Sequence, residues 1–185
     1  MSRPTLKLRY SDLVALPEDG KRHELIDGEH YVSASPTFRH QVVSRNVFRL
    51  IDGFVRPRRL GEIYYAPLDI FLSERDVVVP DLLYVRRERL AILEERFVRG
   101  APDLAVEVLS PSTRRIDLRV KRLAYRKFGF GEYWIVDPVP ETIAVFRGEG
   151  DWLEPAARMS RAAGPQTLTS PLFPGLILTP GEIFE

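Results

Sequence analysis

A strand, a helix and a second strand follow one another between residues 104 and 136, and this succession constrains the fold more than any other part of the sequence. The apolar run 104–109 is predicted to form the first strand, residues 114–128 the helix, and residues 132–136 the second strand. Two strands of one sheet that are joined by a helix lie parallel, with a right-handed crossover. We therefore predict an α/β fold whose sheet contains a parallel pair, with a further strand at 142–147.

Two hairpins are predicted before this unit. Residues 23–26 and 29–34 flank Asp27-Gly28, a dipeptide that tolerates the positive φ angles of a two-residue type I′ turn. Residues 63–72 and 77–85 flank a turn at 73–76 and are predicted to form the second hairpin. Hairpins are antiparallel, so the sheet as a whole should be mixed.

Helices are predicted on either side of the first hairpin, at residues 11–17 and from Ser35-Pro36 onward, with Ser35 as N-cap. The second helix has an apolar stripe, and His40 lies on that stripe three residues before Val43. The charged segment 86–100 should form a short surface helix and a loop. We predict one domain, 1–185, in which residues 148–185 are a C-terminal extension of short strands and turns packed on the core.

Composition excludes several classes of protein. The sequence has no Cys, which rules out disulfides and thiolate metal sites, and no apolar run approaches the ~20 residues that a bilayer requires. The N-terminal residues do not resemble a secretion signal, so we expect a cytoplasmic protein with no membrane partner.

Charge is uneven along the chain although the net charge is only +1. Residues 114–127 contain seven basic side chains, among them Arg114 and Arg115, against Asp117 alone. Basic charge gathered on one element is typical of a protein that binds a polyanion, although a solvated helix face would look the same.

Three carboxylates interrupt apolar or strand-forming sequence: Glu24 in the first hairpin, Asp81 after Pro80, and Glu107 in the middle of the run 104–109. Burying a carboxylate costs several kcal/mol unless a cation or hydrogen bonds compensate it. Mg²⁺ is usually held by one or two protein carboxylates with water and phosphate oxygens, so Asp81 and Glu107 would suffice. The alternative is that each carboxylate pairs separately with one of the many arginines.

Lys121 is one of only 4 lysines beside 23 arginines, and it shares a helix face with Asp117 and Tyr125. That face can look back at the end of the strand 104–109. The ammonium of a lysine is compact and its pKa can be moved by its surroundings, so a catalytic role is conceivable. A surface ion pair between Asp117 and Lys121 is the alternative.

The order of short motifs resembles one family of proteins over about residues 11–147. The motifs are ELIDGE at 24–29, SP with HQ at 35–41, VPD at 79–81, PDLAVEVLSPST at 102–113, DxxxKxxxY at 117–125 and EYWIVDP at 132–138. Together they resemble the Uma-type family of restriction endonucleases, a branch of the PD-(D/E)XK nuclease superfamily.

This resemblance implies a restriction-endonuclease-like core, a mixed β-sheet flanked by helices, in which Asp81 and Glu107 bind a divalent metal with the carbonyl of Val108. The superfamily usually has Lys two residues after the acidic residue, but this chain has Leu109 there. The resemblance implies that Lys121 supplies the lysine and that Glu24 is a further acidic member of the site.

The resemblance therefore implies a Mg²⁺-dependent endodeoxyribonuclease, for which Mn²⁺ could substitute, and we expect it to act on DNA as a homodimer. Arg114 and Arg115 would bind phosphate, and His40 would contact phosphate or orient water, unless it is a histidine at the core edge. The rival hypothesis is a catalytically inactive nucleic-acid-binding or assembly module with the same fold. A third is hydrolysis of another phosphoester at the same site.

Overall fold

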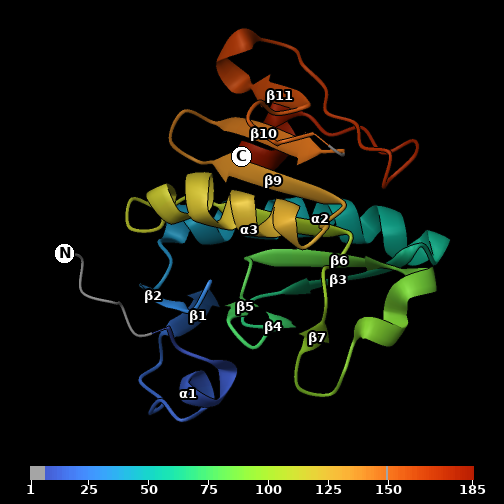
Figure 1. Ribbon diagram of the computed structural model, residues 1–185. Helices are drawn as coiled ribbons and strands as arrows, with labels where there is room; N and C mark the ends of the chain where they lie inside the picture. The colour runs from blue at the N-terminus through green and yellow to red at the C-terminus, as the bar shows by residue number, and fades with distance from the viewer. Residues whose placement is uncertain (1–6, 149) are drawn as a thin grey trace.

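The computed structural model describes residues 7–148 and 150–185, and their strands form two sheets of five and six strands (Figure 1). Residues 1–6 and 149 of the predicted domain lie outside the described part. The fold class is α/β with mixed sheets, as predicted, but the strands are divided between two sheets instead of one.

The five-stranded sheet begins with the predicted first hairpin and has the order β2-β1-β5-β4-β7. Asp27 and Gly28 both have positive φ angles, 51° and 72°, as the type I′ turn requires. The short helix α1 (Tyr10–Val14) precedes this sheet. The strands are β1 (Arg22–Ile26), β2 (Glu29–Ser33), β4 (Ile70–Ser73), β5 (Asp76–Val78) and β7 (Val98–Arg99).

The six-stranded sheet has the order β11-β10-β9-β8-β6-β3 and contains the predicted parallel pair, β8 and β9. The connection between them runs through a π-helical segment, η2 (Ile116–Lys121), and the helix α3 (Arg122–Lys127). The strands are β3 (Gly61–Tyr65), β6 (Leu82–Arg86), β8 (Leu104–Val108), β9 (Glu132–Asp137), β10 (Thr142–Arg147) and β11 (Ala157–Ser160).

The predicted second hairpin is confirmed in its antiparallel pairing around the turn at 73–76, but it does not form one continuous hairpin in one sheet. Each of its two strands is broken in the middle, so that β3 pairs with β6 in one sheet while β4 pairs with β5 in the other. Pro67 and Pro80 lie in the two breaks, and proline cannot donate a ladder hydrogen bond. The chain therefore crosses between the sheets at both prolines, and Asp81 lies at the second crossing.

Each face of the six-stranded sheet has its own core, because side chains alternate along the strands. Leu82 and Tyr84 pack with α2 (Phe38–Arg58) on one face, whereas Leu83 and Val85 pack with α3 and the first sheet on the other. Burial of one such side chain stabilises the fold by about 1.5–3 kcal/mol. Ala105 and Leu109 belong to the second face, and alternation puts Glu107 there too.

Helix α2 begins two residues later than predicted. Its N-cap is Thr37, whose hydroxyl accepts a hydrogen bond from the backbone amide of His40 at 3.2 Å. Ser35 and Pro36 precede the helix and line a cavity.

The C-terminal residues complete the core on the α2 side. Strand β11 pairs with β10, and Ile183 and Phe184 are buried in the α2 cluster. The remaining elements are η1 (Arg87–Ile92), η3 (Arg161–Ala163) and α4 (Pro180–Phe184). In the described part of the chain, no helix combines the length and apolar character needed to cross a bilayer.

Candidate active site

The candidate site lies where both sheets meet η2. Strand β6 pairs antiparallel with β8, and Leu82 is opposite Val106. Asp81, just before β6, and Glu107 therefore lie at the same end of neighbouring strands. The shared metal site that was predicted for Asp81 and Glu107 requires such neighbouring positions. Glu24 comes from β1 in the other sheet and Lys121 from the end of η2.

Lys121 is 2% exposed and lies among carboxylates. Its Nζ is 2.8 Å from Oε1 of Glu24 and 2.9 Å from Oε1 of Glu107. Oδ1 of Asp117 is 3.7 Å away, and Asp117 is buried as well. The alternative of a surface pair between Asp117 and Lys121 is therefore wrong. Lys121 is the compensating cation that the buried Glu107 required.

Two further donors hold the carboxylates in place. The hydroxyl of Tyr125 donates to Oε1 of Glu107 at 2.8 Å, and the backbone amide of Val79 donates to Oε1 of Glu24 at 2.7 Å. Sequence reasoning assigned Tyr125 no role. Its place on the helix face of Lys121 was the signal that could have identified it.

Burial dominates the electrostatics of this cluster. It raises the pKa of Glu107 well above its usual value, although the charge of Lys121 partly opposes the shift. Burial also raises the pKa of Asp117 to about 6, against the opposing charge of Lys121. Burial alone would lower the pKa of Lys121, but the charges of Glu107, Glu24 and Asp117 more than reverse this and raise it. The lysine is therefore held protonated.

Asp81 is bound by donors on both carboxylate oxygens. Oδ1 accepts from Nη1 of Arg22 at 2.8 Å, and Oδ2 accepts from Nε2 of His40 at 3.0 Å and from the backbone amide of Val108 at 2.9 Å. Burial would raise the pKa of Asp81, but these hydrogen bonds and the charges of His40 and Arg22 lower it to about 2. Arg22 was missed by sequence reasoning, because nothing distinguishes it from the other arginines of the chain.

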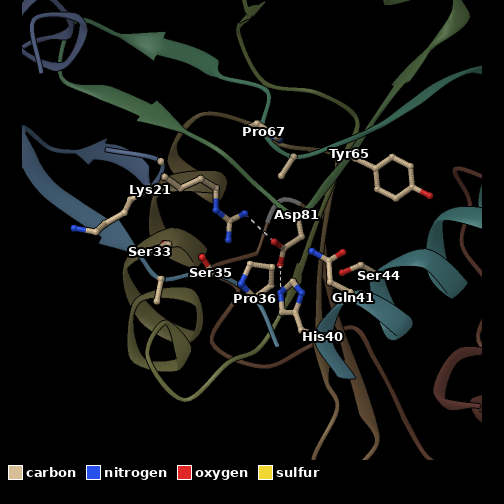
Figure 2. A pocket seen from close by; sticks show the side chains of 14 residues that line it. Lys21, Ser33, Ser35, Pro36, His40, Gln41, Ser44, Tyr65, Pro67 and Asp81 are labelled. Carbon is tan, nitrogen blue, oxygen red and sulfur yellow. Dashed lines mark hydrogen bonds and ion pairs between the residues drawn. The ribbon is translucent and has the colours of Figure 1, made fainter. Parts of the chain in front are cut away.

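A cavity of about 260 Å³ opens beside Asp81 (Figure 2). Lys21, Arg22 and His40 line it together with Gln41 and Tyr65. Neither Glu107 nor Lys121 is among its lining residues. The cavity therefore gives access to the Asp81 side of the site.

The residues present fit a divalent cation by the chemistry of their donors. Asp81 and Glu107 offer carboxylate oxygens at one end of neighbouring strands, which suits a hard cation that also takes water and phosphate oxygens. Among the described residues, no group of three or more His, Cys, Asp or Glu side chains is arranged to hold a metal. A cation here would thus rest on two carboxylates, and Arg22 occupies an oxygen of one of them.

The other predicted residues are placed as follows. His40 is buried and bonded to Asp81, so its imidazole orients that carboxylate. Val108 contacts Asp81 through its amide, and its carbonyl as a metal ligand stays a prediction. Arg114 and Arg115 are exposed, and Arg114 forms an ion pair with Asp137.

Comparison with known proteins adds a family and a fold. The family model described as "Uma2: Putative restriction endonuclease" matches residues 10–181. The fold is similar to a crystal structure from Anabaena variabilis ATCC 29413 that is described as a putative nuclease, with a TM-score of 0.79 and 21% identity. That match covers 96% of this chain and 97% of the other. No match was found among curated proteins.

Proposed function

Because the chain belongs to the Uma2 family of "putative restriction endonucleases", we propose that it is a metal-dependent nuclease that hydrolyses phosphodiester bonds of DNA. One observation carries the proposal: Lys121 reaches Glu107 at 2.9 Å, at the strand end that Glu107 shares with Asp81. A site with only a structural ion pair would need one carboxylate for one lysine. Here one buried ammonium faces Glu24, Glu107 and Asp117, which favours a further cation.

In this proposal Asp81 and Glu107 would hold Mg²⁺, with Mn²⁺ as a substitute and the carbonyl of Val108 as a further ligand. When bound, the cation would polarise a phosphodiester oxygen and make a water molecule a better nucleophile. Lys121 would stabilise negative charge that develops on the phosphate, since its raised pKa makes it a poor proton acceptor. Glu24 would hold Lys121 in position through the 2.8 Å contact.

His40 and Val108 would fix the orientation of Asp81, because both donate to its Oδ2. A carboxylate held in one rotamer binds a cation without first losing its own conformational freedom. Arg114 and Arg115 are exposed just before η2, and from there they would bind DNA phosphates. The homodimer stays a prediction.

The test is cleavage of supercoiled plasmid with Mg²⁺, with Mn²⁺ and with chelator. We expect cleavage that requires the metal and that falls by about 10²-fold or more in Asp81→Asn and in Glu107→Gln, the scale for loss of one preorganised group. Arg158→Ala, an exposed change on β11, serves as the control for purification and folding.

The rival function, a catalytically inactive nucleic-acid-binding module, is favoured by one observation: both oxygens of Asp81 already have protein donors. It predicts DNA binding that survives chelator, with no cleavage by wild-type protein under any metal. Cleavage that Asp81→Asn leaves unchanged would contradict the nuclease proposal at this site.

A further inference from the structure

Arg22 makes a contact that the proposed metal site does not use. Its guanidinium reaches from β1 of the five-stranded sheet to Asp81, at the start of β6 in the other sheet. Nη1 lies 2.8 Å from Oδ1 of Asp81 and 3.4 Å from the carbonyl oxygen of Val79. The side chain is 20% exposed and lines the cavity of Figure 2, in which dashed lines mark the contacts of Asp81.

The two oxygens of Asp81 are held differently. Oδ2 has two donors, the imidazole of His40 and the backbone amide of Val108, and neither can move far without disturbing α2 or β8. Among the described residues, Oδ1 accepts only from Arg22, whose long side chain can rotate. Oδ1 is therefore the oxygen that can be freed for another ligand.

A guanidinium and a divalent cation compete for the same oxygen. Both carry positive charge, and Arg22 is attracted by the charges of Asp81, Glu107 and Glu24, the carboxylates that would also attract the metal. One anionic oxygen at hydrogen-bond distance from an arginine cannot also lie at the roughly 2.1 Å that Mg²⁺ requires without strong repulsion between the cations.

We propose that Arg22 is a built-in counter-ion of Asp81 that leaves Oδ1 when a divalent cation binds and moves into the cavity beside it. The proposal rests on the metal site proposed above. In the metal-free protein Arg22 balances the charge of Asp81, and it thereby lowers the affinity of the site for metal. Once the cation has replaced the guanidinium at Oδ1, the charge of Arg22 faces the cavity.

The test is Mn²⁺ binding by isothermal titration calorimetry, without nucleic acid and without any measurement of activity. Arg22→Met keeps the apolar part of the side chain and removes the competing charge. We expect it to bind Mn²⁺ about 10- to 100-fold more tightly than wild type, which corresponds to the loss of one charged hydrogen bond. Asp81→Asn should bind far more weakly than either.

Arg86→Met is the matched control. Arg86 pairs with the buried Asp103 at 2.7 Å, and without Arg86 the carboxylate of Asp103 keeps a second partner, Arg89, just as Asp81 without Arg22 keeps the hydrogen bond of His40. Mn²⁺ affinity should be unchanged in this variant. Arg22→Gln removes the charge but can still donate to Oδ1. Its Mn²⁺ affinity therefore tests the proposal if Arg22→Met fails to fold. It should bind Mn²⁺ more tightly than wild type, though less tightly than Arg22→Met.

The outcomes separate this proposal from the metal site itself. Equal or weaker Mn²⁺ binding by the Arg22 variants, with binding that still depends on Asp81, would overturn the role of Arg22 and leave the metal site standing. If Arg22 only held Asp81 in position, its variants would bind Mn²⁺ more weakly than wild type. No Mn²⁺ binding by wild type or by any Arg22 variant would overturn both.

Discussion

Lys121 compensates several buried carboxylates, so its removal should affect stability as well as any activity. Lys121→Ala leaves Glu24 and Glu107 without their cation, and an uncompensated buried charge costs about 3–5 kcal/mol. We expect a loss of that size in the free energy of unfolding, measured with urea near pH 7. Lys127→Ala, on the exposed part of α3, should change it by less than about 0.5 kcal/mol. A Lys121→Ala protein as stable as wild type would mean that the carboxylates have other partners.

Asp117 should make stability depend on pH. Its pKa is about 6 in the folded protein against an ordinary value of 3.8, so the folded state binds this proton more tightly than the unfolded state does. Stability is therefore greatest below the ordinary pKa and decreases as pH rises through about 6, by roughly 3 kcal/mol in all.

Asp117→Asn cannot ionise and should lack this decrease. Relative to wild type, the variant should gain about 2 kcal/mol in free energy of unfolding between about pH 4 and pH 7, measured with urea at both values, because part of the full change lies below pH 4. If the free energies of unfolding of the two proteins change with pH in parallel, folding does not raise the pKa of Asp117.

At the scale of elements, the segment from Arg114 through α3 has two sides with different charges. Its inner side carries Lys121 and Tyr125 toward the carboxylates, and its outer side carries exposed cations. The exposed cations are Arg114, Arg115, Arg119, Arg126 and Lys127. The seven basic residues predicted as one set thus divide into the buried Lys121, the half-buried Arg122 and five solvent-facing cations.

The outer side should determine how DNA binding depends on salt. Each phosphate contact that is lost reduces the slope of log affinity against log salt by about 0.9 on duplex DNA. Arg115→Ala should reduce it by about that amount, and Arg114→Ala by less, because Arg114 already pairs with Asp137. Arg158→Ala on β11 is the control. Fluorescence anisotropy over a salt series measures the slopes, and equal slopes for all variants would exclude this face from DNA binding.

Local patterns in the sequence predicted the elements well where neighbours in the chain are neighbours in space. The hairpin around Asp27-Gly28 and the parallel unit from β8 to β9 are of this kind. The broken strands around Pro67 and Pro80 were not predictable, because an apolar run does not say which of two sheets it will join. The π-helical form of η2 also escaped, since helical spacing alone does not distinguish i+4 from i+5 bonding.

The residues of the candidate site could also be predicted only where the pattern in the sequence is local. Asp81 and Glu107 could be proposed because they interrupt apolar sequence, and Lys121 because it is one of few lysines and lies on a helix face that can look back at the strand 104–109. Arg22 could not, because its contact with Asp81 spans the two sheets and no spacing rule relates β1 to β6.

At the scale of the whole molecule, the two cores on either side of the six-stranded sheet should unfold together. Trp134 lies in the cluster on the α2 side and Trp152 in the cluster on the α3 side, and both are buried. Trp134→Phe and Trp152→Phe each leave one tryptophan to report on one core. If the chain is one domain, fluorescence and far-UV circular dichroism should give the same urea midpoint within each variant. Separate midpoints would divide the described chain into two domains.

The distance along the chain between Glu24 and Lys121 has a consequence for synthesis on the ribosome. Glu24 belongs to the first hairpin and its ammonium partner to the second half of the chain. At roughly 5–20 residues per second, Lys121 is translated several seconds after Glu24. During that interval the nascent hairpin must keep Glu24 in water, since no other lysine or arginine side chain pairs with it in the described structure. The candidate site can therefore be complete only after η2 has left the exit tunnel, and an unfinished chain lacks the cation that neutralises Glu24.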